Sequence, residues 1–273
     1  MNSENPAQKV HLVVQSKGGV GKTFISTLLC QHLCQRSAKV LLIDTDPLNV
    51  SSSSSRVLER FTSDQLQVQK LRLSERKSAT IGDFQQLADL TKFAEPGTEL
   101  VIDVGTSIYD QLLKWLLSRG MGALQLSEDL GAKLMLHVPL AGGAEFTDTL
   151  ATLSKLRAEP DLQNAHFTVW LNNSLRGRVF TGADTPQRHD IVPSERMSVI
   201  DLPDEEDIDL STFGVALLKM NRAGLCFWDF GADYVRQHGL PQIDSREVST
   251  GELRWIRAAQ HIYMQKIAEG WAA

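Results

Sequence analysis

Q-S-K-G-G-V-G-K-T, residues 15–23, is the stretch that decides the fold. An apolar run at 11–14 precedes it and a helical pattern at 24–33 follows, which is the order of a phosphate-binding loop. Glycines carry no Cβ, so the backbone can turn sharply and direct successive N–H groups at one anion, and the helix start adds its unpaired amides. Lys22 adds a positive charge for the β- and γ-phosphates, and the Thr23 hydroxyl can ligate Mg²⁺. The residues expected to contact the nucleotide are Gly18, Gly19, Val20, Gly21, Lys22, Thr23 and Phe24.

Length and composition set the frame for this loop. A chain of 273 residues with 42% hydrophobic residues can bury a sizeable core, so we expect a single domain over 1–273 with a flexible N-terminus at 1–9. The formal net charge of −5 provides no global positive field for DNA or anionic lipid. Cys30, Cys34 and Cys226 are too few and too scattered for a disulfide framework or a zinc site. Neither a signal peptide nor a membrane span is apparent, and the composition predicts a soluble, cytoplasmic protein.

Short apolar runs alternate with helical patterns along the whole chain. Runs with little polar alternation are typical of parallel strands that are covered on both faces. The predicted fold class is therefore α/β, a doubly wound, mostly parallel sheet flanked by helices. The predicted strands are 10–14, 39–44, 68–73 (an edge strand), 99–104, 133–138, 167–171 and 198–202. The predicted helices are 24–33, 81–93, 107–117, 145–159, 212–220, 227–238 and 250–268, with a helical turn at 57–61.

Five consecutive serines, residues 51–55, follow the second predicted strand. Serine side chains compete with the backbone for hydrogen bonds, so such a run favours irregular structure. We expect residues 49–56 to form a mobile loop rather than a linker between domains, because strand and helix patterns resume on both sides.

Two predicted strands end in aspartate at the edge of the sheet where ligands bind in open α/β folds. Asp44 and Asp46 lie two apart and point the same way if the strand continues, so one can order a water on Mg²⁺ and the other can orient an attacking water. Asp103 ends the third apolar strand and suits a carboxylate in the Mg²⁺ shell, and Gly105 can present its N–H to the γ-phosphate. The alternative is a turn of strand-end aspartates with Pro47.

The glycine-rich loop carries an extra lysine, Lys17, directly before its glycines, and this form of the loop resembles that of a known family. K-G-G-V-G-K-T has the K-G-G-x-G-K-[ST] form of the deviant phosphate-binding loop of the ParA/MinD ATPases, and I-D-T-D-P has the form of their first switch. The resemblance implies ATP/ADP and Mg²⁺ as cofactors and an ATP-sandwich homodimer, in which Lys17 reaches the nucleotide of the other subunit. It also implies that Asp46 positions the hydrolytic water and that Asp44 lies near the magnesium shell. The alternative for Lys17 is a solvated loop lysine.

Further strings narrow the resemblance within that family. H-V-P-L-A-G-G, T-D-T-L and V-W-L-N, with Asn49 after I-D-T-D-P, resemble the TraL proteins of plasmid conjugal transfer, a branch of the family, over residues 10–210. Phe24 and the serine run depart from the family pattern. Family members often carry an asparagine at the end of the V-W-L-N-N strand, so Asn172 is the expected adenine contact and Pro203 a wall of the base site. A turn-forming Asn172–Asn173 pair is the competing interpretation.

Two features of the C-terminal part, its basic residues and its last helix, raise the question of a DNA or membrane partner. Arg176, Arg178, Arg236, Arg246, Arg254, Arg257 and Lys266 are diluted by acidic residues at 204–209, which favours solvated faces over a DNA surface. The amphipathic helix at 250–273 resembles a membrane-binding tail, but its basic face is sparse, which favours packing onto the sheet and makes a membrane partner unfavourable.

Three hypotheses for function follow. The first is an ATPase that converts ATP and water to ADP and phosphate, is stimulated by a protein partner, and serves as a dimerisation switch in plasmid conjugal transfer or partition. The second is a metabolic ATP-dependent ligase or reductase subunit, against which the absence of a C-x-x-C motif argues. The third is a regulatory module that holds nucleotide without turnover.

Overall fold

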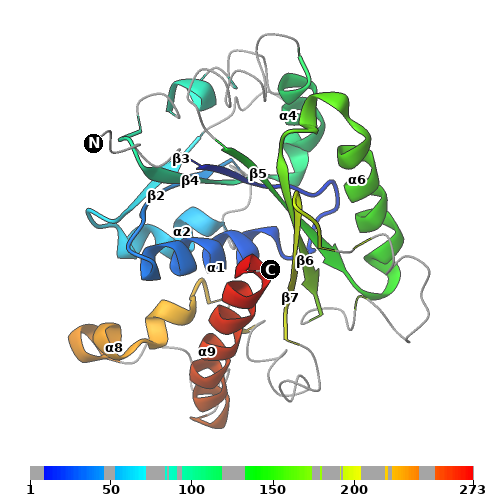
Figure 1. Cartoon of the computed structure of the whole chain (residues 1–273). Helices are drawn as coiled ribbons and strands as arrows, with labels where there is room; N and C mark the ends of the chain where they lie inside the picture. Colours follow the sequence, from blue (N-terminus) through cyan, green and yellow to red (C-terminus); the bar gives the residue numbers. More distant parts are fainter. Residues whose placement is uncertain are drawn as a thin grey trace.

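The sheet lies at the centre of the molecule with helices on both faces (Figure 1). The computed structural model describes residues 9–45, 53–71, 84, 86–90, 94–118, 133–173, 179, 191, 193–203, 219–220, 223–239 and 250–272. Within these residues seven strands form one sheet in the order β3-β2-β4-β1-β5-β6-β7, and every neighbouring pair is parallel. The predicted doubly wound parallel sheet is confirmed.

The strands follow the predicted apolar runs, with small differences at their ends. β5 continues through Pro139 to Ala141, beyond the predicted end at 138, and β3 begins two residues earlier than predicted and lies at the sheet edge. The strands are β1 (Lys9–Val13), β2 (Lys39–Asp44), β3 (Leu66–Lys70), β4 (Thr98–Asp103), β5 (Lys133–Ala141), β6 (His166–Asn172) and β7 (Met197–Asp201).

β1 occupies the point at which the chain changes direction across the sheet. β2 and β3 lie on one side of the β4–β1 pair, and β5, β6 and β7 lie on the other side. In open α/β sheets the crevice at such a switch point, beyond the carboxyl ends of the strands, holds the ligand. The glycine-rich stretch follows β1 directly and therefore lies at this crevice.

Helices cover the two faces of the sheet and enclose two apolar cores. Alternate residues of β1 point to opposite faces: Val10 and Leu12 pack with α4 and α6, whereas Val13 packs with α1 and α9. The helices are α1 (Lys22–Gln35), α2 (Ser54–Leu58), α4 (Tyr109–Leu116), α6 (Phe146–Ala158), α8 (Ala232–His238) and α9 (Thr250–Ala272). The single-turn 3₁₀ helices are η1 (Glu59–Phe61), η2 (Thr106–Ile108), η3 (Gly143–Glu145), η4 (Pro160–Leu162) and η6 (Phe227–Phe230).

Three predictions on the helices need correction or completion. The segment 227–238 is not one helix, because Gly231 has extended backbone (φ −64°, ψ 149°) that separates η6 from α8. The predicted loop at 49–56 is wrong for residues 54–56, which begin α2. Of the helices predicted at 81–93 and 212–220, residues 84, 86–90 and 219–220 are helical and the rest lies outside the described residues.

The last helix, α9, packs onto β7, as its amphipathic pattern predicted, and it also contacts η6 and α1. Ile256, Tyr263 and Ile267 are fully buried, and a Cβ at Gly270 would lie only 2.7 Å from the carbonyl oxygen of Val199. Trp255 does not belong to this buried stripe, since 39% of its surface is exposed. Within the described residues, we find no helix with the length and apolar character needed to traverse a bilayer.

A buried polar chain crosses the sheet beneath α1 and α9. The Trp170 indole N–H donates to Nδ1 of His137 at 3.0 Å, Nε2 of His137 lies 2.8 Å from Nδ1 of His11, and Nε2 of His11 lies 2.6 Å from a carboxylate oxygen of Glu99. Because the indole is only a donor, this order assigns a proton to Nε2 of each histidine and leaves both rings neutral. The ring of Trp271 lies near both imidazoles, tilted by 31° to that of His11 and by 58° to that of His137. Burial lowers the pKa of both histidines.

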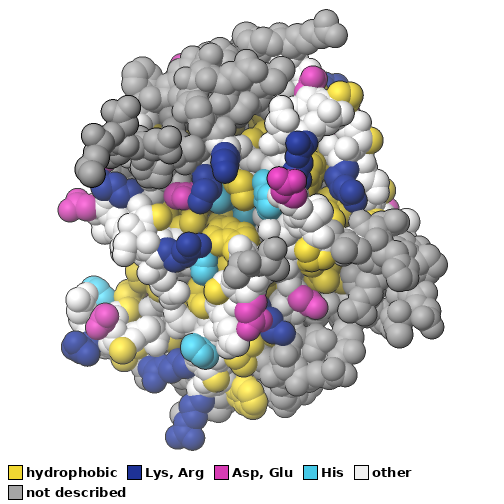
Figure 2. Space-filling view, in the orientation of Figure 1, with side chains coloured by type: hydrophobic (Ala, Val, Ile, Leu, Met, Phe, Trp, Pro, Cys, Tyr) yellow, Lys and Arg dark blue, Asp and Glu magenta, His cyan; other side chains and the backbone are white. Residues whose placement is uncertain are grey.

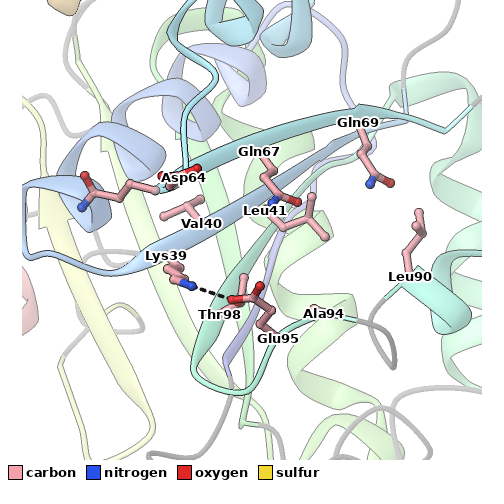
Figure 3. A pocket seen from close by; sticks show the side chains of 11 residues that line it. Lys39, Val40, Leu41, Asp64, Gln67, Gln69, Leu90, Ala94, Glu95 and Thr98 are labelled. Atoms are coloured by element: carbon pink, nitrogen blue, oxygen red, sulfur yellow. Dashed lines mark hydrogen bonds and ion pairs between the residues drawn. The ribbon is translucent and has the colours of Figure 1, made fainter.

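A hollow of about 240 Å³ lies between the β2–β3 edge on one side and Leu90, Ala94 and Glu95 on the other (Figure 3). Gln67 and Gln69 project from β3 into it, Leu41 and Leu90 contribute apolar walls, and the Lys39–Glu95 ion pair lies at its rim. The edge strand thus presents a polar face toward this hollow, whereas Leu66 on its other face packs with α1 and α2.

Candidate functional site

The loop between β1 and α1 turns through two glycines in the left-handed region. Gly19 has φ 71° and Gly21 has φ 96°, a conformation that residues with a Cβ rarely adopt. Gly21 is the residue directly before α1, so the backbone reverses at the point where the helix amides begin. The turn chemistry predicted from the sequence is confirmed at these two positions.

Lys22 folds its side chain back into the loop. It is only 7% exposed, and its ammonium donates to the main-chain oxygen of Lys17 at 2.9 Å and to Oγ1 of Thr106 at 2.7 Å. Thr106 belongs to η2, which follows β4, so the lysine joins the loop after β1 to the segment after the neighbouring strand. The result is a positive charge held inside a cradle of glycine backbone, which suits an anion.

Two side chains, the buried Gln15 and the exposed Ser16, hold the start of the cradle to the far half of the sheet. The Gln15 amide donates to the main-chain oxygens of Pro139 at 2.9 Å and Thr149 at 3.2 Å, and the Ser16 hydroxyl lies 2.7 Å from that of Thr152. β5 and α6 therefore fix the start of the loop, and this bracing was not predicted from the sequence.

Asp44 and Asp103 lie side by side next to the loop. They are register partners on β2 and β4, and each is 2% exposed. Burial raises the pKa of Asp103 to about 6, the negative charge of Asp44 adds to this rise, and the hydroxyls of Ser54, Thr23 and Ser26 oppose it. Among the described residues Oδ2 of Asp103 has no hydrogen-bond partner. Two adjacent buried carboxylates with an unsatisfied oxygen form a site that a cation would stabilise.

The serine run contacts these carboxylates. Oδ2 of Asp44 accepts hydrogen bonds from the Ser55 N–H at 3.1 Å and from the Ser55 hydroxyl at 2.6 Å. Ser53 is the N-cap of α2 and accepts from the Arg56 N–H. Serine is a favoured N-cap residue, so the polar composition that suggested a loop instead begins a helix that the Asp44 carboxylate anchors.

Thr45 joins the ends of β2 and β4. Its hydroxyl donates to the main-chain oxygen of Asp103 at 2.7 Å and accepts from the Gly105 N–H at 3.1 Å. The Gly105 N–H, which the sequence assigned to a γ-phosphate, is thus engaged within the protein in this structure. It reaches a phosphate only if the Thr45 contact opens.

Comparison with protein-family models shows which family the chain belongs to. The model described as "CobQ/CobB/MinD/ParA nucleotide binding domain" matches residues 11–220, from β1 to beyond β7. The chain belongs to this family.

Two relatives named Protein TraL, both from Escherichia coli, are each 30% identical over 164 residues, covering 60% of this chain. The match spans 63% of each relative, which is less than two thirds of their length. Similar solved structures include a ParA family ATPase from Chlorobium tepidum TLS, at 15% identity and TM-score 0.44, covering 92% of this chain and 98% of that one. The MinD cell division protein of Aquifex aeolicus has 14% identity and TM-score 0.42, covering 94% and 97%.

This family member has donors that fit Mg²⁺. Mg²⁺ prefers oxygen ligands and keeps several waters and phosphate oxygens in its shell, so it needs only a few protein groups. Asp103, with its unsatisfied Oδ2, stands beside Asp44 and the Thr23 hydroxyl. Among the described residues, no group of three or more histidine, cysteine or acidic side chains is placed to hold a metal ion.

Lys17, the distinctive lysine of the loop, turns toward α6 in the single chain. Its ammonium pairs with Asp148 at 2.8 Å and with Glu145 at 3.0 Å, and 40% of its side chain is exposed. The hydrogen bonds that its ammonium donates to Asp148 and Glu145 raise the pKa of Lys17. The cross-subunit role stays a prediction, and it requires Lys17 to leave these two carboxylates.

Asn172 and its neighbours lie at the ends of β6 and β7. The Asn172 amide donates to the main-chain oxygen of Val20 at 2.9 Å and is 1% exposed, so it braces the phosphate loop in this structure rather than facing an open base site. Asn173 lies in a turn after β6, and its side-chain amide donates to the carboxylate of Asp201 and to the main-chain oxygen of Leu202. The predicted adenine contact of Asn172 and the wall at Pro203 remain predictions, and Pro203 is buried.

The structure assembles most, but not all, of the predicted site. The loop residues, the Lys22 ammonium, Asp44, Asp103 and Gly105 lie together at the carboxyl ends of β1, β2 and β4, while Phe24 points into the core against Phe227 and Tyr263. Asp46, the predicted water-positioning residue, lies outside the described residues. The roles of Thr106, Ser55 and the two acids that pair with Lys17 were missed, since no local motif marks them.

Proposed function

We propose that this member of the CobQ/CobB/MinD/ParA family binds ATP with Mg²⁺, hydrolyses it slowly to ADP and phosphate, and uses the nucleotide to switch between monomer and homodimer. The observation that carries the proposal is the juxtaposition of the Lys22 cradle with the buried Asp44–Asp103 pair. A cation between the carboxylates and a triphosphate would reduce the repulsion between them, and the Lys22 ammonium in the cradle would offset part of the phosphate charge. We place Lys17 across the dimer interface and Asp46 at the attacking water.

The biological setting is proposed from the named relatives. The TraL relatives support a role in plasmid conjugal transfer or partition, and we propose that a protein partner stimulates hydrolysis. On the face shown in Figure 2 basic side chains are interspersed with acidic ones, so this face does not favour DNA binding. Packing of α9 onto β7 removes its apolar face from any lipid surface.

We expect Asp46→Ala to lower ATP turnover at least about tenfold while Mg²⁺–ATP binding persists, because the change removes only the group that orients water. Phosphate release and equilibrium nucleotide binding are measured on the same preparations. Asp161→Ala, at an exposed aspartate of η4, is the matched control. Equal turnover in parent and Asp46→Ala would remove Asp46 from the mechanism, and binding without turnover in the parent would favour the regulatory module.

We expect Lys17→Ala to abolish ATP-dependent dimerisation without changing the mass of the nucleotide-free protein. The lysine is the loop's one charge that lies partly exposed, so it can reach another subunit. Light scattering with a nonhydrolysable ATP analogue gives the mass of parent, Lys17→Ala and the control Lys155→Ala, at an exposed lysine of α6. Equal dimer fractions in all three would refute the cross-subunit role.

A further inference from the structure

We infer that Ser55 is a positioning residue for Asp44, and that the segment from Ser53 to Phe61 couples the cation site to η6. The inference rests on the proposed Mg²⁺–nucleotide site. It assigns a role to the serine run that neither the phosphate-loop motif nor the aspartates require.

The N-terminal end of the segment, at Ser55, binds the carboxylate of Asp44. The Ser55 hydroxyl and N–H both donate to the same oxygen of Asp44, at 2.6 and 3.1 Å, and Ser55 is 1% exposed. The short hydroxyl contact has the length of a charge-assisted hydrogen bond. The Ser53 hydroxyl lies 3.2 Å from that of Ser55, so the capping serine helps to orient the donor. The Asp44 carboxylate therefore has a fixed rotation before any cation arrives.

The C-terminal end of the segment, at Arg60 and Phe61, contacts η6. Arg60 donates from Nε to one carboxylate oxygen of Asp229 at 2.8 Å and from a terminal nitrogen to the other oxygen. Asp229 is fully buried in η6 and also accepts from the Cys226 N–H at 2.7 Å. Phe61 packs edge-on against Trp228, with ring centroids 5.3 Å apart.

The two ends are joined by a continuous short helix. α2 ends at Leu58 and η1 runs from Glu59 to Phe61, while Val57 and Leu58 are buried against the α1 side of the core. Such a segment transmits displacement because it cannot absorb a shift by local bending without breaking buried contacts. A change in the Asp44 hydrogen bonds on cation binding therefore reaches Arg60 and, through it, η6.

The first test is the Mg²⁺ dependence of nucleotide binding. Groups that orient a ligand typically contribute 10–100-fold to metal affinity, so Ser55→Ala is expected to raise the Mg²⁺ concentration for half-maximal ATP binding by about tenfold. ATP binding in EDTA and the melting temperature of Ser55→Ala are expected to stay near the parent values. If Ser55 only stabilised the fold, the melting temperature would fall instead. Ser154→Ala, at an exposed serine of α6, is the matched control.

A double-mutant cycle shows whether Ser55 acts through Asp44. In an Asp44→Asn background, Ser55→Ala should have no further effect on the Mg²⁺ dependence. An unchanged Mg²⁺ dependence in Ser55→Ala, or the same loss with and without Asp44→Asn, would overturn the positioning role and leave the proposed function standing. Absence of Mg²⁺-dependent ATP binding in the parent would overturn both.

The coupling is tested by hydrogen exchange of residues 226–238. In the parent, ATP with Mg²⁺ should change exchange in this segment, and ATP with EDTA should not. Arg60→Lys keeps the charge but cannot make the bidentate contact with Asp229. The change in hydrogen exchange should therefore be lost, while Mg²⁺-dependent ATP binding remains. A response retained in Arg60→Lys, or absent from the parent, would refute the coupling.

Discussion

Lys22→Ala is expected to weaken ATP binding by roughly a hundredfold or more. The ammonium is held inside the glycine cradle by its contacts with Lys17 and Thr106, and its loss would remove charge-assisted hydrogen bonds to phosphate, which contribute about 1.5–3 kcal/mol each. The variant also loses the link between the loop and Thr106, so the empty cradle becomes less well defined. Titration with a fluorescent ATP analogue at fixed Mg²⁺ measures the effect.

Two further variants separate charge from structure at this position. Thr106→Val removes the same loop link but keeps the ammonium, and is expected to retain most of the affinity. Lys155→Ala, exposed on α6, controls for the loss of one positive charge. If Lys22→Ala binds ATP as the parent does, the loop is not the phosphate site.

Acidification from pH 7.5 to 5.5 is expected to lower the free energy of unfolding through the buried histidine chain. Burial lowers the folded-state pKa of His11 and His137 below the usual 6.5, so the unfolded chain takes up protons first. The contribution is fully present above pH 6.5 and is lost as the pH falls toward the folded-state values. Asp103 has a pKa raised to about 6 and acts in the opposite sense in this window. Urea unfolding of parent and Asp103→Asn at both pH values separates the two effects.

His137→Phe is expected to destabilise the fold at pH 7.5 and to flatten this pH dependence. The substitution leaves the Trp170 N–H and Nδ1 of His11 buried without their partner, at about 1–3 kcal/mol for each group. His261→Phe, at an exposed histidine of α9, is the control. A pH dependence as steep as that of the parent would place the titrating groups elsewhere, for example at His32, whose pKa is lowered to about 4.

Local sequence patterns predicted the features that depend on residues close together in the chain. Glycines at 19 and 21 are required by positive φ angles, and the apolar runs at β1, β2 and β4 are required by burial on both faces, so both can be recognised in the sequence. Serine is ambiguous by the same reasoning, because it suits a loop and a helix N-cap equally. The break at Gly231 was missed for a related reason, since an isolated glycine does not by itself end a helical pattern.

The sequence by itself determined the parallel sheet, the glycine cradle with Lys22, and the strand-end aspartates, because each follows from neighbours along the chain. Only the tertiary structure decided that Ser55 holds Asp44, that Lys17 pairs with Asp148, and that His11, His137 and Glu99 form one buried chain. These pairs are separated by 11 to 131 residues, and strand order and register decide which side chains meet. Hydrogen bonds require contact to within about 3 Å, which no periodicity in a single sequence encodes.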